Sequence, residues 1–213
     1  MSNGAVAAAS GKTAQHHVHR DPVGAKTGMW LFLFTELLLF GGLFVIYSVY
    51  RNMYAAEFHH AAGELNVALG VTNTMVLLTS SLTMVLSITS LQRGWVGRSL
   101  GFLAATMSGA VIFMVIKFFE WSAKYHHHIF PGQAHLMELP HGEDLFFNLY
   151  FMMTGLHGIH VVIGLIVMIV VFFKVKGGSI HQGRVETLDF TGLYWHLVDL
   201  IWIFLLPLFY LTA

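Results

Sequence analysis

The chain has 213 residues, of which 56% are apolar and only 10% are charged. A soluble domain carries about 25% charged residues, so this composition excludes a disordered chain and a nucleic-acid-binding protein. The 11 basic residues balance the 11 acidic ones, and the absence of cysteine excludes disulfides, thiolate metal sites and iron–sulfur clusters. The class that remains is a membrane protein.

The first 27 residues are polar and small, and they lack the apolar stretch of a cleaved secretory signal. We expect a flexible cytoplasmic tail here, with the Asp21-Pro22 pair as a stop before the first ordered element. Residues 28–213 then make up one membrane domain.

Five long apolar segments follow in chain order: 28–50, 66–91, 100–121, 145–173 and 193–211. A helix of about 20 residues crosses the apolar core of a bilayer and satisfies its own backbone polar groups. The alternating ten-residue strands of a membrane barrel are absent from the sequence. The fold class is therefore all-α, a polytopic bundle of five transmembrane helices.

The distribution of basic residues predicts the orientation of this bundle. With the N-terminus in the cytoplasm, eight Lys and Arg lie on the cytoplasmic side and three on the other side. Positive charge collects on the cytoplasmic side of membrane proteins. We therefore expect a cytoplasmic N-terminus and a C-terminus on the outer side.

The segment 66–91 is the least apolar of the five, with nine Thr and Ser between residues 72 and 90. Small hydroxyl residues allow close helix contact and bond to carbonyl groups of their own helix. The sequence places this helix inside the bundle.

Glu36 lies within the first apolar segment, with no basic residue of that segment inside two turns. A buried carboxyl of this kind is a functional candidate by default. It is either a proton-linked carboxyl facing another protein helix or a neutral acid hydrogen-bonded to a neighbouring helix. The Gly41-Gly42 pair further along is interpreted as a packing feature, because no strand precedes it.

Lys117 and Glu120 lie three residues apart near the end of the third segment and share a face. The simpler interpretation is an interfacial pair whose Lys extends to the membrane surface. The alternative is a contact with a partner subunit.

His157, His160 and Gly164 form one stripe, and Gly155, Gly158 and Gly164 predict a close neighbouring backbone. The favoured interpretation is that both histidines are neutral and form hydrogen bonds to neighbouring helices. Haem or metal ligation and a proton relay are the alternatives, although a zinc site needs a third ligand.

The last segment carries His196 and Asp199 three residues apart, so the two side chains can hydrogen-bond along the helix. Trp195, Asp199 and Trp202 form a second stripe. An Asp–His pair supports many catalytic sites, but it equally serves as a satisfied polar pair between helices, and the sequence offers no nucleophile beside it.

Three histidine clusters, at residues 16–19, 59–60 and 126–128, fall in the tail and the loops. Such tracts bind metal in some proteins. We interpret these as solvated surface that gains charge below about pH 6.5.

Five motifs resemble subunit III of the haem–copper oxidases, the cytochrome c oxidase and quinol oxidase family. In chain order they are TELLLFGGLFVIY, TNTMVLLTSS, KFFEW, TGLHGIHVVIG and YWHLVDLIWIFLL, each on the matching helix. The chain resembles the short five-helix bacterial form, which lacks the first two helices of longer members.

This resemblance implies an accessory subunit of a terminal oxidase in the bacterial inner membrane that reduces oxygen to water. Such a subunit packs against catalytic subunit I, beside subunit II, and supports stability and proton uptake. Haem and copper belong to those partner subunits, and bound phospholipid is expected. No catalytic, cofactor or metal residue is implied in this chain.

Carried over by motif, Glu36 matches the family's buried carboxyl on the side of the catalytic subunit. The residues that match those holding the bundle together are Glu120, His157, His160, Trp195, His196, Asp199 and Trp202. By position and charge alone, Lys174, Lys176 and Arg184 are candidate contacts to anionic lipid or subunit I.

Other functions stay open at this point. A subunit III-like chain also accompanies nitric oxide reductases. A haem-b membrane anchor would use His157, His160 or His196 as ligands at matched depth. A proton-coupled transporter would use Glu36 and Asp199, but repeats and broken helices are not seen in the sequence.

Overall fold

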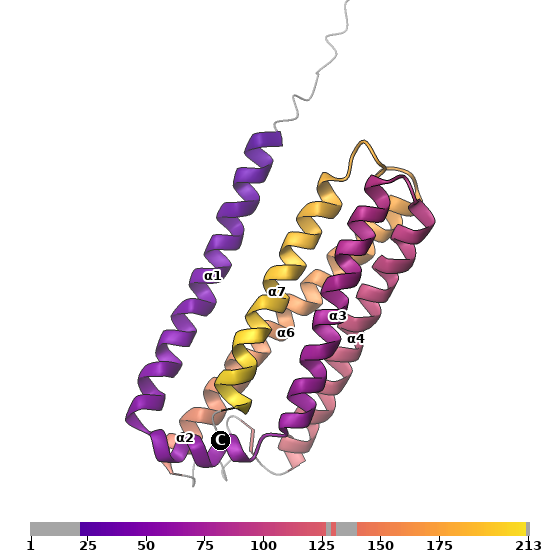
Figure 1. The fold of residues 1–213 in the computed structure, drawn as a ribbon. Helices are drawn as coiled ribbons and strands as arrows, with labels where there is room; N and C mark the ends of the chain where they lie inside the picture. Colours follow the sequence, from indigo (N-terminus) through magenta and orange to yellow (C-terminus); the bar gives the residue numbers. More distant parts are fainter. Residues whose placement is uncertain (1–21, 127–128, 131–139, 212–213) are drawn as a thin grey trace, which may run out of the picture.

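The computed structural model describes residues 22–126, 129–130 and 140–211. Within them, five helices are long and apolar enough to cross a membrane (Figure 1). They are α1 (Pro22–Met53), α3 (Val67–Gln92), α4 (Val96–His126), α6 (His141–Lys176) and α7 (Glu186–Tyr210). The predicted all-α fold with five membrane helices is confirmed.

The helices run past the apolar segments that predicted them. For example, α7 begins at Glu186, seven residues before the expected start at residue 193, and α1 begins at Pro22. A helix continues through polar interfacial turns because its backbone hydrogen bonds still form there, and proline is well tolerated in a first turn. The predicted tail at residues 1–27 is too long, because residues 22–27 are already helical in α1, and residues 1–21 lie outside the described part of the chain.

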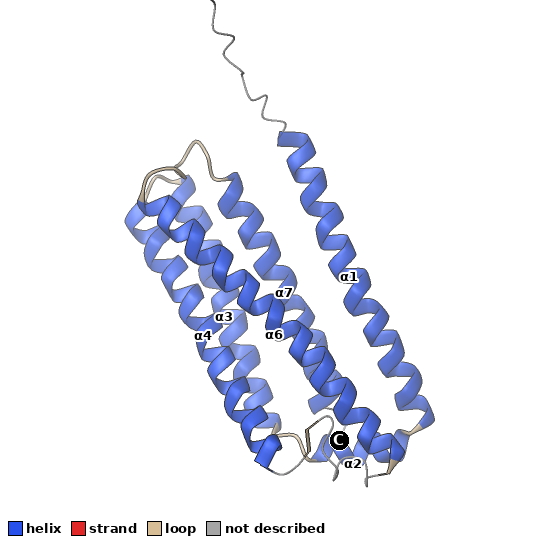
Figure 2. Ribbon diagram, turned by 180° about the vertical axis from the view of Figure 1, so that it is seen from behind, coloured by secondary structure: helices blue, strands red, loops and turns tan. Residues whose placement is uncertain are grey.

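Four helices form a bundle and the fifth stands to one side. In both ribbon views α3, α4, α6 and α7 lie together, while α1 is set apart from them along most of its length (Figures 1 and 2). The N-terminal end of α1 and the C-terminal end of α7 lie at opposite ends of the bundle (Figure 1).

A short helix that the sequence did not predict, α2 (Ala55–Gly63), lies across the end of the bundle where α7 finishes (Figure 1). It buries Phe58, Ala61 and Ala62, and Phe58 packs edge-on against Tyr47 and Phe146. Nine residues are too few to span a membrane. Through Phe58, α2 instead packs against α1 and α6 at this end of the bundle.

The expected interior position of residues 66–91 is only partly correct. The Thr72, Thr79 and Thr89 hydroxyls donate to carbonyls of their own helix, as predicted, but they do so on an exposed face. In the most apolar window of each helix, 39% of residues are buried in α3 and 50% in α7. The last helix is therefore the more enclosed one.

Candidate functional site

Glu36 and His160 form the mid-helix polar link between α1 and α6. His160 Nε2 lies 2.9 Å from Glu36 Oε2, and the two side chains are 12% and 16% exposed. The other ring nitrogen, Nδ1, lies 2.8 Å from the Leu156 carbonyl oxygen. The hypothesis of a carboxyl hydrogen-bonded to a neighbouring helix agrees with this geometry.

The carbonyl partner restricts the protonation states of this pair. A carbonyl oxygen only accepts, so Nδ1 of His160 carries a proton. Nε2 then either accepts from a protonated Glu36 or, in an imidazolium, donates to an ionised one. Both arrangements leave the pair without net charge, which is what a half-buried site in a membrane requires.

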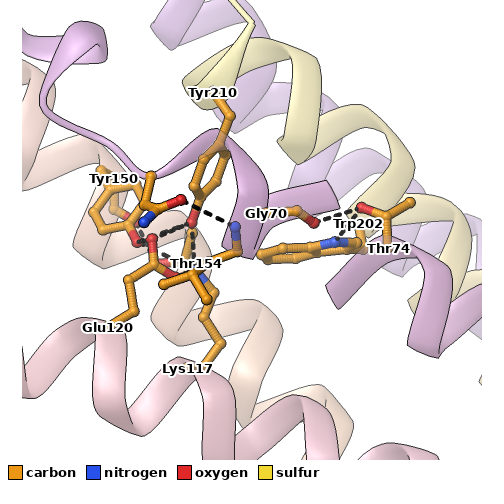
Figure 3. Close-up of polar contacts among 10 residues, drawn as sticks. Gly70, Thr74, Lys117, Glu120, Tyr150, Thr154, Trp202 and Tyr210 are labelled. Atoms are coloured by element: carbon orange, nitrogen blue, oxygen red, sulfur yellow. Dashed lines mark hydrogen bonds and ion pairs between the residues drawn. The ribbon is translucent and has the colours of Figure 1, made fainter. Parts of the chain in front are cut away.

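A closed polar network joins α4, α6 and the end of α7 (Figure 3). Lys117 Nζ donates to Glu120 Oε2 at 3.0 Å, to the Tyr150 hydroxyl at 3.1 Å and to the Tyr210 hydroxyl at 2.7 Å. Both hydroxyls in turn donate to Glu120 Oε1, at 3.0 and 2.6 Å. All three Nζ donors and both carboxylate oxygens are thereby satisfied.

This network corrects the interpretation of Lys117 as a surface-seeking interfacial residue. Its side chain is 8% exposed, and Nζ lies 4.8–5.3 Å from the ring centroids of Tyr150, Trp202 and Tyr210. An aromatic cage of this kind stabilises a desolvated ammonium group through the ring quadrupoles. Lys117 therefore points into the bundle, where the i, i+3 carboxylate compensates its charge and two tyrosine hydroxyls accept its other hydrogen bonds.

Two tryptophans fasten α7 to α3. Trp195 Nε1 donates to Ser80 Oγ at 3.1 Å, and two turns further Trp202 Nε1 donates to Thr74 Oγ1 at 3.0 Å. Both indoles are fully buried. The hydroxyl groups of α3 thus accept the indole protons, so no buried N–H of these two residues is left unpaired.

The five motifs therefore supply several of the polar contacts between the helices, and known proteins have similar sequences. A family model described as cytochrome c oxidase subunit III matches residues 6–213. The chain belongs to the cytochrome c oxidase subunit III family.

Similar proteins with curated names include subunits of cytochrome c oxidases and of ubiquinol oxidases. The chain is 26% identical to cytochrome c oxidase subunit 3 of Thermostichus vulcanus, over 94% of this chain and 93% of the relative. It is 28% identical to cytochrome bo(3) ubiquinol oxidase subunit 3 of Pseudomonas aeruginosa, over 92% and 90%. It is 27% identical to heme-copper oxidase subunit I+III of Aeropyrum pernix, over 88% of this chain but 22% of that longer protein. The chain is thus a subunit III of a haem–copper oxidase and a multi-pass membrane protein.

Two histidines of this subunit III do not share one site, contrary to the stripe that their spacing suggested. His160 faces α1, whereas His157 is fully buried with ring centroids of Phe113 and Trp202 5.6 and 5.2 Å away. Residues three apart on a helix differ by about 60° in direction, which is enough to send one side chain to α1 and the other into the core.

The expected His196–Asp199 pair is also not formed. The Ser81 hydroxyl lies 2.6 Å from His196 Nδ1, whereas the Asp199 carboxyl forms no hydrogen bond with this ring. Within the described residues, the polar side-chain atoms of Asn73, His157 and Asp199 are buried and make no hydrogen bond. Ser81 of α3 has thus replaced Asp199 as the partner of His196.

The glycines of the motifs differ in how closely a neighbouring side chain approaches them. A Cβ on Gly164 would lie 3.0 Å from the Trp195 ring and one on Gly155 would lie 3.2 Å from the Trp121 ring, so aromatic side chains and not a backbone approach them. Nothing lies within 4 Å of a Cβ built on Gly158, Gly41 or Gly42. The Gly41-Gly42 pair is therefore no packing feature inside this chain.

The arrangement offers little for a bound metal. Among the residues that the structure describes, no three His, Cys, Asp or Glu side chains gather in a group suited to a metal ion. The predicted loop position of residues 59–60 is wrong, because both histidines lie in α2, where His60 pairs with Glu143 at 3.1 Å. Of the cluster at residues 126–128, His126 is the last residue of α4, while residues 127–128 and the cluster at residues 16–19 lie outside the described part of the chain.

The basic residues Lys174, Lys176 and Arg184 all lie at the end of the molecule where α6 finishes, and all three are exposed. Sequence reasoning missed Tyr150 and Tyr210, the two hydroxyls of the Lys117 network. A buried charge pair needs further hydrogen-bonding partners, and tyrosines on other apolar helices were the signal for them.

Proposed function

We propose that this chain is an accessory subunit of a proton-translocating terminal oxidase with no catalytic or redox centre of its own. The observation that supports this proposal is that the polar side chains of the membrane helices bond within the chain. Glu36, His160, Lys117 and Glu120 bond to one another or to neighbouring helices of the same chain. Both ring nitrogens of His160 are engaged, so a haem would have to displace existing contacts to bind there.

The chain supports the oxidase by presenting α1 to catalytic subunit I. Only 11% of the most apolar window of α1 is buried. The matched family carboxyl, Glu36, lies on this helix, and the open glycines Gly41 and Gly42 would admit a close partner helix. The relative from Aeropyrum pernix, named subunit I+III, supports subunit I as the main partner, with subunit II and further subunits in the same complex.

The haem and copper that reduce oxygen to water, with electrons from cytochrome c or quinol, belong to the partner catalytic subunits. The complex lies in the bacterial inner membrane with the N-terminus of this chain in the cytoplasm. The exposed residues Lys174, Lys176 and Arg184 then face the cytoplasm, where they contact anionic phospholipid or subunit I.

The test is purification of the complex in mild detergent, followed by an optical difference spectrum of the complex and of this chain alone. The expected result is haem bands and a co-purified catalytic subunit in the complex, and no haem in the isolated chain. Stoichiometric haem b retained by the isolated chain would contradict the proposal and make His157, His160 or His196 a ligand.

A further inference from the structure

The turn between α3 and α4 holds two arginines against one indole. Arg93 Cζ lies 5.7 Å and Arg98 Cζ 4.5 Å from the ring centroid of Trp95. The backbone of Trp95 is fixed on both sides, because its N–H donates to the Ser90 carbonyl at 2.9 Å and its carbonyl accepts from the Ser99 N–H at 3.0 Å. Both guanidinium groups therefore lie beside one positioned ring.

This turn carries uncompensated positive charge. Residues 92–100 contain no acidic residue, and neither arginine forms an ion pair with another described residue. The α6–α7 loop lies against the turn, since a Cβ on Gly94 would be 3.3 Å from Gln182 Oε1. That loop adds Arg184 and, over residues 174–185, likewise contains no acid. Two like charges held on one ring repel each other, and an anion between them relieves that repulsion.

The surroundings of the turn indicate which anion it receives. The turn lies where two membrane helices end, Trp95 is 47% exposed and Val96 is 38% exposed. Tryptophan is enriched at the depth of lipid headgroups, and a guanidinium group matches a phosphate in shape and charge. Exposed apolar atoms beside the charges suit an acyl chain better than they suit water.

We propose that Arg93, Trp95 and Arg98 form a binding site for the phosphate of an anionic phospholipid in the adjacent membrane leaflet. The indole spaces the two guanidinium groups, and the apolar side chains at the start of α4 contact the lipid chain. This site is separate from α1 and from the ends of the polar network, so it does not depend on which subunit α1 contacts.

The test uses the purified, delipidated oxidase complex, titrated with phosphatidylglycerol or phosphatidylcholine, with retained lipids counted by native mass spectrometry. The double variant Arg93→Gln/Arg98→Gln is expected to retain one fewer phosphatidylglycerol, with affinity lowered about thirtyfold for the loss of two basic groups. Its phosphatidylcholine content should not change. Trp95→Leu should weaken retention, and Trp95→Phe should weaken it less.

Arg51→Gln is the matched control, because Arg51 is a basic residue in the last turn of α1 at the opposite end of the molecule. It should leave phosphatidylglycerol retention at this site unchanged. Equal retention by the double variant would overturn the proposal. So would displacement of the lipid by millimolar inorganic phosphate alone, or loss of another subunit in place of a lipid, which would assign the turn to a protein contact.

Discussion

The first and last membrane helices are both strongly apolar, yet the structure uses them in opposite ways. In α7, 50% of the most apolar window is buried within the chain, whereas in α1 only 11% is. The last helix is held by indole and phenol hydrogen bonds to α3, α4 and α6. In the described part of α1, Glu36 bonds to His160 and the Tyr47 hydroxyl donates to the Leu208 carbonyl, while Phe40 is buried against the His160 ring.

This difference shows that hydropathy identifies a membrane helix but not its neighbours. In lipid, an apolar face gains little by packing on another apolar face, so polar groups and close packing decide which helices associate. The last helix has many such groups and closes the bundle. The first helix has few, which leaves its surface available to another subunit.

The largest expected effect comes from breaking the network that holds α7. Lys117→Met leaves Glu120 buried without its cation and should cost about 3–5 kcal/mol of stability. The measurement is the midpoint of detergent- or denaturant-induced unfolding of the purified chain. The double variant Lys117→Met/Glu120→Gln is the control and should recover much of the loss. A single variant as stable as the wild type would show that the network does not hold the helix.

A matched pair of glycines extends the comparison to packing. A Cβ on Gly109 would lie 2.8 Å from Ser80 Cβ, so Gly109→Ala should cost about 1–3 kcal/mol through overpacking. Gly41→Ala meets no neighbour within 4 Å and should stabilise the isolated chain by up to about 1 kcal/mol. The same unfolding assay separates the two. A destabilising Gly41→Ala would mean that α1 packs inside this chain after all.

The link between α1 and α6 should show a smaller effect. Glu36→Gln can still donate to His160 Nε2 and should change stability by less than about 1 kcal/mol, whereas Glu36→Leu leaves that nitrogen unpaired and should cost about 1–3 kcal/mol. In the purified complex, Glu36→Gln should leave the haem spectrum unchanged and alter only the durability of turnover or pumping. An equal cost of both variants would indicate an ionised Glu36–His160 pair, and loss of a haem band would argue against an accessory role.

The smallest effect is expected where α2 meets α6. His60 and Glu143 are 3.1 Å apart, but the His60 side chain is 70% exposed. His60→Ala should therefore change stability by about 0–1 kcal/mol. Phe58→Ala, in the buried face of the same helix, should cost about 3–5 kcal/mol. If the histidine variant is the more damaging one in the unfolding assay, the buried ring is not what fixes α2.

The five spans could be predicted from the sequence because apolar length is a local property of the chain. The partners of the buried polar groups could not, because they depend on packing between distant segments. Lys117 bonds to Tyr210, which is 93 positions away in the sequence, and Glu36 bonds to His160, which is 124 positions away. The short α2 was missed because its buried face holds only three residues among polar ones.

Spacing arguments succeeded or failed according to what the neighbouring helix offered. Lys117 and Glu120 do pair as their i, i+3 spacing predicted. His196 and Asp199 have the same spacing, but Ser81 on α3 bonds to His196 in place of Asp199. A pattern within one helix therefore predicts which side chains are close, and the facing helix decides which of them bond.

The measurement that tests the account most directly is site-specific photo-crosslinking in the assembled oxidase. Leu38 on α1 and Leu82 on α3 are equally exposed, at 58% and 59%, so a crosslinking residue at either position meets lipid to the same extent in the isolated chain. The account predicts that the α1 position crosslinks to catalytic subunit I and the α3 position does not. A crosslink to subunit I from the α3 position alone would contradict the assignment of α1 as the surface that joins this subunit to the oxidase.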